Sequence, residues 1–458
     1  MTKFDYDLIA IGSGSAGGLA AFVAKRAEAK VAVVEEFKEK LGGNCPNYAC
    51  VPTKALLKAA EVYREVKNAG QFGVYADNPR FDFNKIAEYR DGIVGQLTGM
   101  RIERNLKNAG IDLIWGRAKF VSRHELEIAG RRYSAANIVI GTGSKEFIPP
   151  IEGLAETGFI VSDQAARMDH LPKSVIIIGA GPVGTEFAQI FSSFGVKVTV
   201  LQRDSQILQR EDPEAAALVE ESLVGQGVKI VLNMEVISVN KEGSEKRVKV
   251  KVGNEEQEFR AEEIMIAAGR RAALEGLDLQ TAGVAVTPSG KLELNEYLQT
   301  SQPHIWAAGD AAGNWQFTHT AAYEGDLVGR NIIHRHEEKV DYSVVPRVTF
   351  CYPEVASVGI TEKEAQTKSL KVRVEKFSVG GMGRSLIERE RRGFIKLVAE
   401  KETLQILGAH VAGLHAGQLV HELAVAMKSK FPITEVARMI HAYPSFSEAV
   451  GAAAEKFL

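Results

Sequence analysis

The sequence is poor in sulfur, with only three cysteines among 458 residues. So few cysteines exclude the disulfide framework of small secreted proteins, and a reducing cytoplasm is the expected compartment. No apolar run approaches the roughly 20 residues that a membrane-spanning helix needs. The first residues, MTKFDYDLIAIG, contain neither the basic segment nor the apolar core of a signal peptide. We therefore predict a cytoplasmic protein that has no membrane partner.

The sequence also lacks a clear excess of basic over acidic residues, or of acidic over basic ones. Lys and Arg together number 56 and Asp and Glu 58, so the net charge is −2. This balance provides no basic surface for nucleic acid, and no nucleic-acid partner is expected. The composition is otherwise ordinary, with 45% hydrophobic and 25% charged residues. Because a domain usually takes roughly 100–200 residues, the length predicts about three domains.

Glycine, in contrast, marks two strand–turn–helix units. The first, YDLIAIGSGSAGGLAAFVAKRAEAKVAVVE, predicts a strand, a glycine turn, a helix and a second strand that ends at Glu35. Gly12, Gly14 and Gly17 fit G-x-G-x-x-G, the pattern that allows a tight turn, close approach of a pyrophosphate and close helix packing. The terminal acid binds ribose hydroxyls, and the helix N-terminus binds phosphate oxygens. Together these features predict a dinucleotide site.

The pattern returns in SVIIIGAGPVGTEFAQIFSSFGVKVTVLQR, with Gly179, Gly181 and Gly184 at the three glycine positions. Two such units in one chain predict two dinucleotides. A flavin that exchanges electrons with a nicotinamide is the expected pair, because those cofactors supply redox chemistry that side chains lack.

The second unit differs from the first where the base specificity of the nicotinamide is set. Gln202 stands where an acid would reject a 2′-phosphate, Arg203 follows it, and Arg210 lies nearby in the sequence. A missing carboxylate and an added guanidinium favour NADPH over NADH. The alternative is that Arg203 is only a solvated charge at the end of a strand.

Two of the three cysteines stand close together in GGNCPNYACVPTK, residues 42–54. A zinc site would need further Cys or His at ligand spacing. On an undistorted helix, Cα atoms five residues apart lie roughly 8–9 Å apart, whereas a disulfide needs less than about 7 Å. Cys45 and Cys50 can therefore bond only if the segment departs from helical geometry. Pro46 and Pro52 favour such a departure.

The residues after Pro52, TKALLKAAEVYREVKNA, predict an amphipathic helix. The N-terminus of that helix would lower the pKa of a nearby thiol. The alternative is that the two cysteines are small buried hydrophobic residues.

These motifs together resemble those of the class I pyridine nucleotide–disulfide oxidoreductases, which include dihydrolipoamide dehydrogenase, glutathione reductase and mercuric reductase. Those enzymes carry G-G-x-C-x(4)-C-x-P-[ST]-K after the FAD glycine unit, as this sequence does. The resemblance extends over essentially the whole chain. NIVIGTGSKEFIPP and EEIMIAAGRR border the nicotinamide domain, TSQPHIWAAGDAAG is the second FAD fingerprint, and YPEVASVGITE begins the interface domain.

The resemblance implies an α/β fold with two Rossmann-like, three-layer domains, one for FAD and one for NAD(P), and a C-terminal α+β dimerisation domain. The implied bounds are 1–145 for the FAD domain with its redox-active disulfide helix and 146–269 for the NAD(P) domain. Residues 270–337 complete the FAD domain, and residues 338–458 form the interface domain. The implied assembly is a two-fold homodimer.

The resemblance also implies roles for individual residues. Cys50 lies against the flavin as the charge-transfer thiolate, and Cys45 is the interchange thiol that attacks the substrate. Lys54 and Glu186 match an ion pair near flavin N5, although Glu186 alone is typical of a helix surface. His319 is expected to be structural. The expected cofactor-binding residues are Gly12, Gly14, Gly17, Glu35, Gly42, Asn44, Thr142, Gly143, Gly179, Gly181, Gly184, Gln202, Arg203, Gly269, Arg270, Gly309 and Asp310.

The family pattern changes near the C-terminus, where the resembling enzymes have an acid/base histidine in H-P-T-x-x-E. Here the stretch is IHAYPSFSEAV, so Tyr443 precedes Pro444 and Glu448 is in place. Tyrosine has an ordinary pKa near about 10 and is a poor base at neutral pH, but it can donate a hydrogen bond. His441 shares a face with Tyr443 if the segment is extended, or is a structural neighbour. The acid/base assignment stays open between these residues.

The predicted activity transfers a hydride from NAD(P)H to FAD, then electrons to the Cys45–Cys50 disulfide and on to a small-molecule or protein disulfide (EC 1.8.1.-). NADPH is the expected donor and NADH the alternative. Dihydrolipoamide dehydrogenase chemistry is the same relay in reverse. Mercuric reductases share the tyrosine before the proline, so a metal-ion or quinone reductase is the main alternative. They also end in a cysteine pair, whereas this sequence ends AAAEKFL.

Two further classes are weighed against this interpretation. A redox-sensing partner protein would bind FAD but show negligible turnover of NADPH. A soluble transhydrogenase would not need the cysteine pair. No resident metal is expected, and the sequence does not identify the disulfide substrate.

Overall fold

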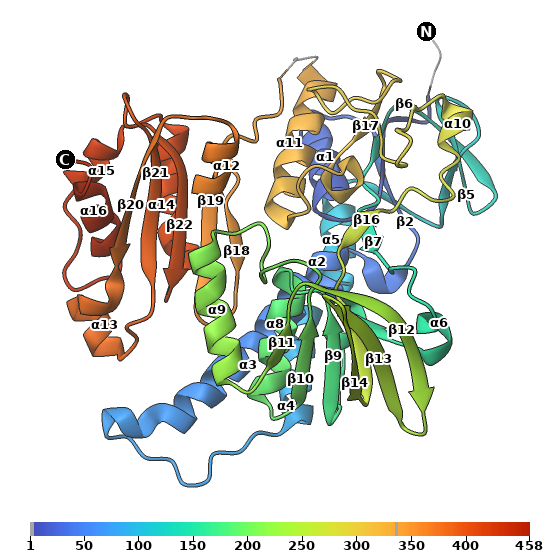
Figure 1. Ribbon diagram of the computed structural model, residues 1–458. Helices are drawn as coiled ribbons and strands as arrows, with labels where there is room; N and C mark the ends of the chain where they lie inside the picture. The colour runs from blue at the N-terminus through green and yellow to red at the C-terminus, as the bar shows by residue number, and fades with distance from the viewer. Residues whose placement is uncertain (1–3, 335–337) are drawn as a thin grey trace. The chain divides into compact units, whose positions relative to one another are not determined.

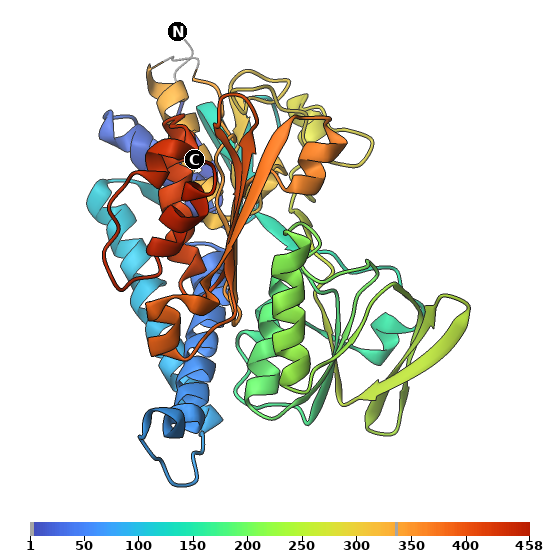
Figure 2. The same cartoon turned by 60° about the vertical axis from the view of Figure 1, so that its left-hand side comes forward.

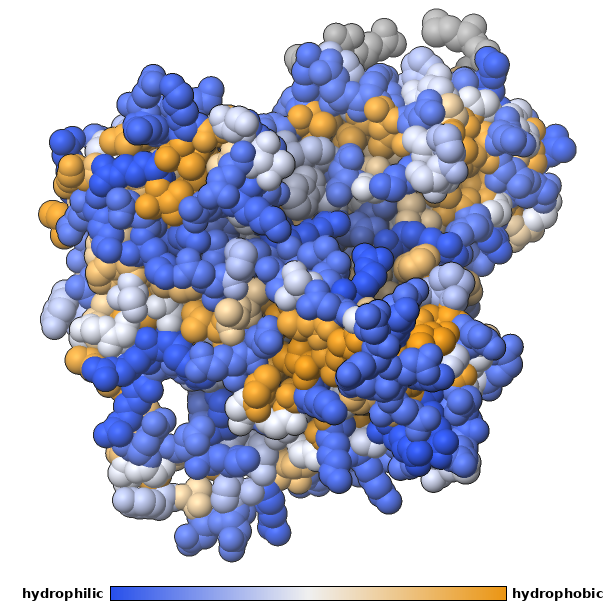
Figure 3. Space-filling view, viewed as in Figure 1, coloured by the Kyte–Doolittle hydropathy of each residue, from blue (hydrophilic) through white to orange (hydrophobic). Residues whose placement is uncertain are grey.

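The computed structural model describes residues 4–334 and 338–458 (Figures 1 and 2). By their internal contacts these residues form two compact units. The first unit holds residues 1–55, 84–147 and 269–340, and the second holds residues 56–83, 148–268 and 341–458. Among the described residues, none of the helices combines the length and apolar character that a membrane span requires. The face drawn in Figure 3 is mostly hydrophilic, with apolar patches of limited extent.

The first unit contains a sheet with strand order β3-β2-β1-β6-β5-β4, and β17 pairs with β6. Its parallel strands are almost wholly apolar because both faces of such a sheet are covered, and Leu8, Ile9 and Ala10 of β1 are fully buried. The strands of this unit are β1 (Tyr6–Ile11), β2 (Val31–Glu35), β3 (Asp112–Trp115), β4 (Ala118–Phe120), β5 (Glu125–Ile128), β6 (Arg131–Ile140), β7 (Ser144–Glu146), β16 (Arg270–Ala272) and β17 (Ile305–Ala307).

Helices and turns connect these strands. Helix α1 follows β1 directly after the glycine turn and packs against α11. The helical elements are α1 (Ser15–Arg26), η1 (Lys38–Lys40), α2 (Asn44–Tyr48), α3 (Cys50–Asn68), α4 (Phe83–Leu97), α5 (Met100–Ala109), α10 (Leu279–Ala282), η3 (Gly309–Ala312) and α11 (Thr318–His334). Helix α3 continues into the second unit.

The second unit contains a parallel sheet of order β11-β10-β9-β15-β8. A three-stranded antiparallel meander, β12-β13-β14, packs on it through an apolar cluster that includes Ile176, Val248 and Val250. The elements are β8 (Ile160–Val161), β9 (Ser174–Ile178), β10 (Lys197–Leu201), β11 (Lys229–Val231), β12 (Met234–Glu242), β13 (Glu245–Val252), β14 (Glu255–Ala261), β15 (Glu263–Ile266), η2 (Ala69–Phe72), α6 (Leu154–Thr157), α7 (Ser162–Ala165), α8 (Pro182–Ser193) and α9 (Pro213–Gly225).

The second unit also holds a five-stranded antiparallel sheet of order β18-β19-β22-β21-β20, which we call the interface sheet. Helices α14 and α16 contact this sheet, and α9 contacts β19 and β22. The elements are β18 (Arg347–Thr349), β19 (Glu354–Gly359), β20 (Val372–Ser378), β21 (Phe394–Glu400), β22 (Ile406–Gly413), α12 (Glu362–Thr367), η4 (Val379–Gly381), α13 (Gly383–Glu388), α14 (Ala416–Lys428), α15 (Ile433–Ala437) and α16 (Glu448–Glu455). The predicted α/β fold class, with two Rossmann-like sheets and a C-terminal α+β domain, is confirmed.

Candidate active site

The two neighbouring cysteines lie on consecutive helices. Helix α2 ends before Ala49, whose φ of −123° and ψ of −98° are not helical, and α3 begins at the next residue. The side chains of Cys45 and Cys50 are hydrogen-bonded to one another in the dithiol form. The predicted departure from helical geometry between the cysteines is therefore present, and it brings the two sulfurs together.

Helix α3 begins earlier than predicted. The sequence pattern places its start after Pro52, but the helix starts at Cys50, with Pro52 in its first turn. Proline is tolerated there because the first N–H groups of a helix have no intrahelical partner. As a result Cys50 itself occupies the helix N-terminus, where the aligned peptide dipoles favour a thiolate.

A third residue joins the thiol pair. The hydroxyl of Thr318, the first residue of α11, lies 3.4 Å from the sulfur of Cys50. The hydrogen bond with Cys50 and burial raise the pKa of the Cys45 thiol well above its usual range, while Thr318 and Lys54 act in the opposite direction. A negative charge on Cys50 therefore disfavours a second charge on Cys45.

Residues 42–54, which we call the redox segment, pack against the first glycine turn. Gly12 has a φ of 106°, and a Cβ at Gly17 would lie 2.2 Å from the carbonyl oxygen of Gly12. A Cβ at Gly43 would lie 2.6 Å from the Cα of Gly14, so only glycine allows this approach. The N–H of Gly42 donates to the Ser13 hydroxyl over 2.9 Å. The cysteine segment and the dinucleotide turn are thus one site.

Glu35 lies at the end of β2, as the sequence predicts. Its carboxylate accepts hydrogen bonds from the backbone N–H and the hydroxyl of Ser13 and from the N–H of Phe37. This arrangement places the acid beside the glycine turn, where a dinucleotide ribose binds in this type of unit. Asn44 is the first residue of α2, directly before Cys45.

A second polar cluster lies where β6, β7, β16 and η3 meet. The Ser144 hydroxyl donates to Asp310, and the Arg270 guanidinium donates to Ser144 and, over 2.7 Å, to Glu146. The hydroxyl of Thr142 is buried and has no hydrogen-bond partner among the described residues. An unsatisfied buried hydroxyl is costly unless a bound group accepts or donates to it.

Three predicted glycines of this region have positive φ angles. They are 69° at Gly143, 108° at Gly269 and 72° at Gly309. These values favour glycine over residues with a side chain. The N–H of Gly309 donates to the buried carboxylate of Glu324 over 2.6 Å.

The second glycine turn has the geometry of the first. Gly179 has a φ of 106°, and a Cβ at Gly184 would lie 2.0 Å from the carbonyl oxygen of Gly179. A Cβ at Gly181, in contrast, would meet no heavy atom of the described residues within 4 Å. The open space lies at the glycine position where a pyrophosphate approaches the backbone.

Gln202 is buried beneath this turn. Its carbonyl oxygen accepts a hydrogen bond from the N–H of Ala180 over 2.8 Å, and its amide donates to Asp204. Gln202 therefore takes the place that Glu35 takes in the first unit, but without a charge. The Arg203 side chain is 82% exposed.

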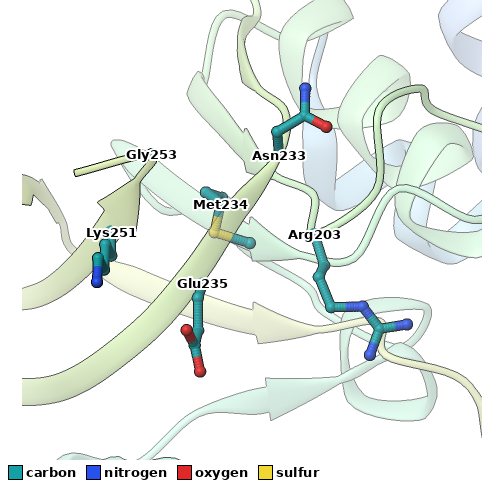
Figure 4. Close-up of a pocket in the computed structure, with 6 residues that line it drawn as sticks. All are labelled: Arg203, Asn233, Met234, Glu235, Lys251 and Gly253. Atoms are coloured by element: carbon teal, nitrogen blue, oxygen red, sulfur yellow. The ribbon is translucent and has the colours of Figure 1, made fainter. Parts of the chain in front are cut away.

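Beside this strand end is an open pocket of about 350 Å³ (Figure 4). Arg203 reaches it from the loop after β10, and the other lining residues come from the start of β12 and the end of β13. The lining combines two cationic side chains with one acid. The pocket is lined by Arg203, Asn233, Met234, Glu235, Lys251 and Gly253.

Glu186, on α8, is not a surface acid. It is 3% exposed, and its carboxylate accepts a hydrogen bond from the N–H of Phe350 over 3.0 Å. Lys54 lies in the first unit, near Cys45. The pairing of Lys54 with Glu186 stays a prediction.

The C-terminal segment separates the two acid/base candidates. His441 donates or accepts a 2.9 Å hydrogen bond with Glu422, and its side chain is 10% exposed. Tyr443 is 79% exposed, so the two side chains lie in different environments. Glu448, the first residue of α16, accepts a hydrogen bond from the N–H of Ser445 over 2.9 Å.

Thr318 is the residue of this site that the sequence analysis missed. It follows Phe317 in a segment noted only for His319, whose ring stacks on Phe317. Its contact with Cys50 joins residues 268 positions apart, and no local pattern reports such a contact. Among the described residues, no cluster of three or more His, Cys, Asp or Glu side chains is arranged to hold a metal ion.

Known proteins resemble this chain over nearly its whole length. The family described as pyridine nucleotide-disulphide oxidoreductase matches residues 6–325, and its dimerisation domain matches residues 345–454. A mercuric reductase of Bacillus cereus is 33% identical over 97% of this chain and 70% of its own length. A dihydrolipoyl dehydrogenase of Bacillus subtilis is 33% identical over 98% of this chain and 97% of its own length. The Cu(II) complex of the HOCl-induced flavoprotein disulfide reductase RclA from Escherichia coli has a TM-score of 0.89 and 28% identity over the whole of both chains.

Two dinucleotide turns, with a cysteine pair packed against the first, define a flavoprotein oxidoreductase that acts on sulfur groups. The chain belongs to the pyridine nucleotide-disulphide oxidoreductase family, whose members use FAD and NAD(P)H. The predicted family and enzyme class, and the predicted use of FAD and NAD(P)H, are thereby confirmed. The dimerisation domain supports the predicted homodimer.

Proposed function

We propose that the protein uses NADPH to reduce a disulfide substrate through Cys45 and Cys50. The observation that carries this proposal is the hydrogen-bonded thiol pair at the N-terminus of α3, with Thr318 and Lys54 beside it. Bound FAD supplies the two-electron step between a nicotinamide and a disulfide. The residues noted above fit such a group, because a buried Thr142 hydroxyl lacks a partner among the described residues.

The proposed sulfur chemistry balances without any further reactant. The thiolate of Cys45 attacks one sulfur of the substrate, forms a mixed disulfide and releases the first thiolate. The thiolate of Cys50 then attacks the sulfur of Cys45, re-forms the Cys45–Cys50 disulfide and releases the second thiolate. The two protons that the pair loses end on the two product thiols. Tyr443, whose side chain is exposed, is the proposed proton relay: it gives a proton to the departing thiolate and regains one that the cysteine pair loses.

The preference for NADPH rests on the second glycine turn. Gln202 holds the turn through hydrogen bonds and brings no negative charge, and the exposed Arg203 and Arg210 supply positive charge on the loop that follows. Space at Gly181 is open to a pyrophosphate. A guanidinium can bind a 2′-phosphate with two hydrogen bonds, so NADPH gains affinity over NADH.

Anaerobic titration with NADPH tests the relay. We expect a long-wavelength charge-transfer band in the wild-type protein, no such band in Cys50→Ser, and loss of disulfide reduction in Cys45→Ser with the band retained. A band that survives in Cys50→Ser contradicts the assigned roles. Equal kcat/KM values for NADH and NADPH contradict the nucleotide preference.

Reduction of a soft metal ion is the second candidate. Three relatives at 32–33% identity are mercuric reductases, and the E. coli structure is a Cu(II) complex. Thiolates are the ligands that such ions prefer. This candidate is favoured over the first if two results hold together. The wild-type protein reduces no member of a panel of disulfides, and the Cys45→Ser variant still turns over Hg(II) or Cu(II).

We also propose three further assignments that rest on the sequence. These assignments are a four-part division at residues 145, 269 and 337, a homodimer in which Tyr443 and Glu448 reach the partner's cysteines, and a cytoplasmic location. The dimerisation domain at residues 345–454 supports the homodimer. Sedimentation of the purified protein tests the dimer, and fractionation of cells tests the location.

A further inference from the structure

The interface sheet carries a row of polar side chains across all five of its strands. Arg347 pairs with Ser357, Ser357 with His410, His410 with Lys396, and Lys396 with Lys376. Directly opposed residues of neighbouring strands project from the same face of a sheet. Four of the five are buried in spite of their polarity: Arg347, Ser357, His410 and Lys396.

Three acids at the start of α9 form ion pairs with side chains of this row. Glu211 binds Arg347 over 3.2 Å and also accepts from the Ser357 hydroxyl. Asp212 binds Lys396 over 2.9 Å. Glu214 binds Lys396 over 2.9 Å and also pairs with Lys376. We call these three acids and the five row residues the charge ladder.

The ladder holds one end of the loop between β10 and α9. Asp212 is the N-cap of α9, and its carboxylate also accepts from the N–H of Glu214 over 3.0 Å. Glu211 and Asp212 are 8% and 1% exposed. A buried ion pair with additional hydrogen bonds fixes geometry, because either partner left alone would be an uncompensated buried charge.

The other end of the same loop lies on the second glycine turn. Ala180, between the first two glycines, donates its N–H to Gln202 and accepts from the N–H of Leu208, each over 2.8 Å. Arg203 and Arg210 are exposed on this loop. The loop that carries both arginines is therefore held between the glycine turn and the interface sheet.

We propose that the interface sheet positions the nicotinamide-binding loop, with Lys396 and Arg347 as positioning residues that act through Asp212 and Glu211. This inference rests on the proposed recognition of NADPH by Arg203 and Arg210. Lys396 and Arg347 touch neither cofactor nor substrate in this account. They hold the loop so that its two guanidinium groups face a 2′-phosphate.

The test measures binding of adenosine 2′,5′-bisphosphate to the flavin-loaded dimer by calorimetry, together with the kinetics of NADPH oxidation. We expect Lys396→Met to raise both the Kd of the probe and the KM of NADPH at least about fivefold, the lower end of typical coupling between sites. The value of kcat at saturating NADPH should stay near that of the wild type. Lys396→Arg should restore binding, because it keeps the charge.

Two further variants separate positioning from loss of fold. Lys428→Met removes a lysine that pairs with Asp341 on the surface of the same domain, so we expect no change in Kd. If Lys396→Met does not yield folded protein, the double variant Asp212→Asn/Lys396→Met removes both buried charges together. Wild-type probe affinity in a folded Lys396→Met or double variant overturns the inference.

If the protein does not prefer NADPH, binding of the probe to the wild-type protein gives a different result. In that case the wild-type protein binds adenosine 2′,5′-bisphosphate no better than 5′-AMP. The same variants are then measured with 5′-AMP and NADH. An unchanged Kd there overturns the positioning role, and a raised Kd supports it for the loop as a whole.

Discussion

The Thr318 hydroxyl lies beside both reacting sulfurs. Thr318 reaches the sulfur of Cys50 from the first turn of α11, while the peptide dipoles of α3 favour negative charge at the same sulfur. Because Thr318 also acts to lower the pKa of the Cys45 thiol, it is the dipole of α3 that favours a thiolate on Cys50 over one on Cys45. The division of labour between the cysteines thus has a local physical cause in addition to the order of the residues in the motif.

Replacing Thr318 with Val keeps the shape of the side chain and removes the hydrogen bond. Because that bond stabilises a thiolate, its loss raises the pKa of the thiolate that forms the charge-transfer band. We expect a rise of roughly 1–2 units, since a hydrogen bond to a charged group contributes about 1.5–3 kcal/mol. The pH dependence of the long-wavelength absorbance of the reduced enzyme measures this shift. Thr318→Ser is the control, and an identical midpoint in Thr318→Val contradicts the assignment.

The exposures of His441 and Tyr443 lead to opposite expectations for their variants. Tyr443→Phe should lower kcat/KM for the disulfide substrate by about 100-fold or more, the usual range for a lost proton donor. His441→Asn removes the partner of Glu422 and should lower the free energy of unfolding by about 1–3 kcal/mol with little effect on kcat. Rate profiles against pH and thermal unfolding of both variants measure these effects. The assignment is wrong if His441→Asn is inactive but as stable as the wild type.

Among the structural elements, the redox segment depends on its contact with the first glycine turn. Gly43 has a φ of 86°, and its Cα approaches Gly14 so closely that no side chain fits between them. We expect Gly43→Ala to displace the segment and to lower the affinity for FAD at least about tenfold, because strain of about 1–3 kcal/mol is added to the clash. Flavin retained after dialysis measures the change.

Gly73→Ala is the matched control for that variant. Gly73 also has a positive φ, 77°, but a Cβ there would meet no heavy atom of the described residues within 4 Å. It therefore adds the strain without the clash. Equal loss of flavin in the two variants would show that the close approach to Gly14 is unimportant.

The same elements show which features a sequence can report. Glycine turns, the acid after β2 and the break between the cysteines depend on neighbours within one motif, so the pattern predicts them. The start of α3 was misplaced because Pro52 fits a first turn as well as it fits a loop. Thr318 and the burial of Glu186 were missed because their contacts with Cys50 and Phe350 join distant parts of the chain.

On the scale of the whole molecule, carboxylates whose pKa values shift on folding tie stability to pH. Burial alone raises the pKa of Glu390, but hydrogen bonds from Arg392 and Tyr352 outweigh it and hold the pKa below its usual value. Burial likewise raises the pKa of Glu214, and Lys376 and Lys396 outweigh it. A lowered folded-state pKa contributes stability that is present above the unfolded value of 4.5 and is lost as pH falls through the folded value.

The pKa of Glu354 shifts in the opposite direction, because burial raises it in the folded protein. Thermal unfolding followed between about pH 6 and pH 3 separates these groups. We expect Glu390→Gln to flatten the decline of Tm with acid, because the variant has no carboxylate there to protonate. Glu354→Gln should steepen the decline, because the wild-type residue takes up its proton more readily when folded and so favours folding in acid. Parallel curves for both variants and the wild type would mean that other carboxylates govern acid unfolding. If the curve is flatter for Glu390→Gln alone, the loss of stability in acid is assigned to the cluster that Glu390 forms with Arg392 and Tyr352.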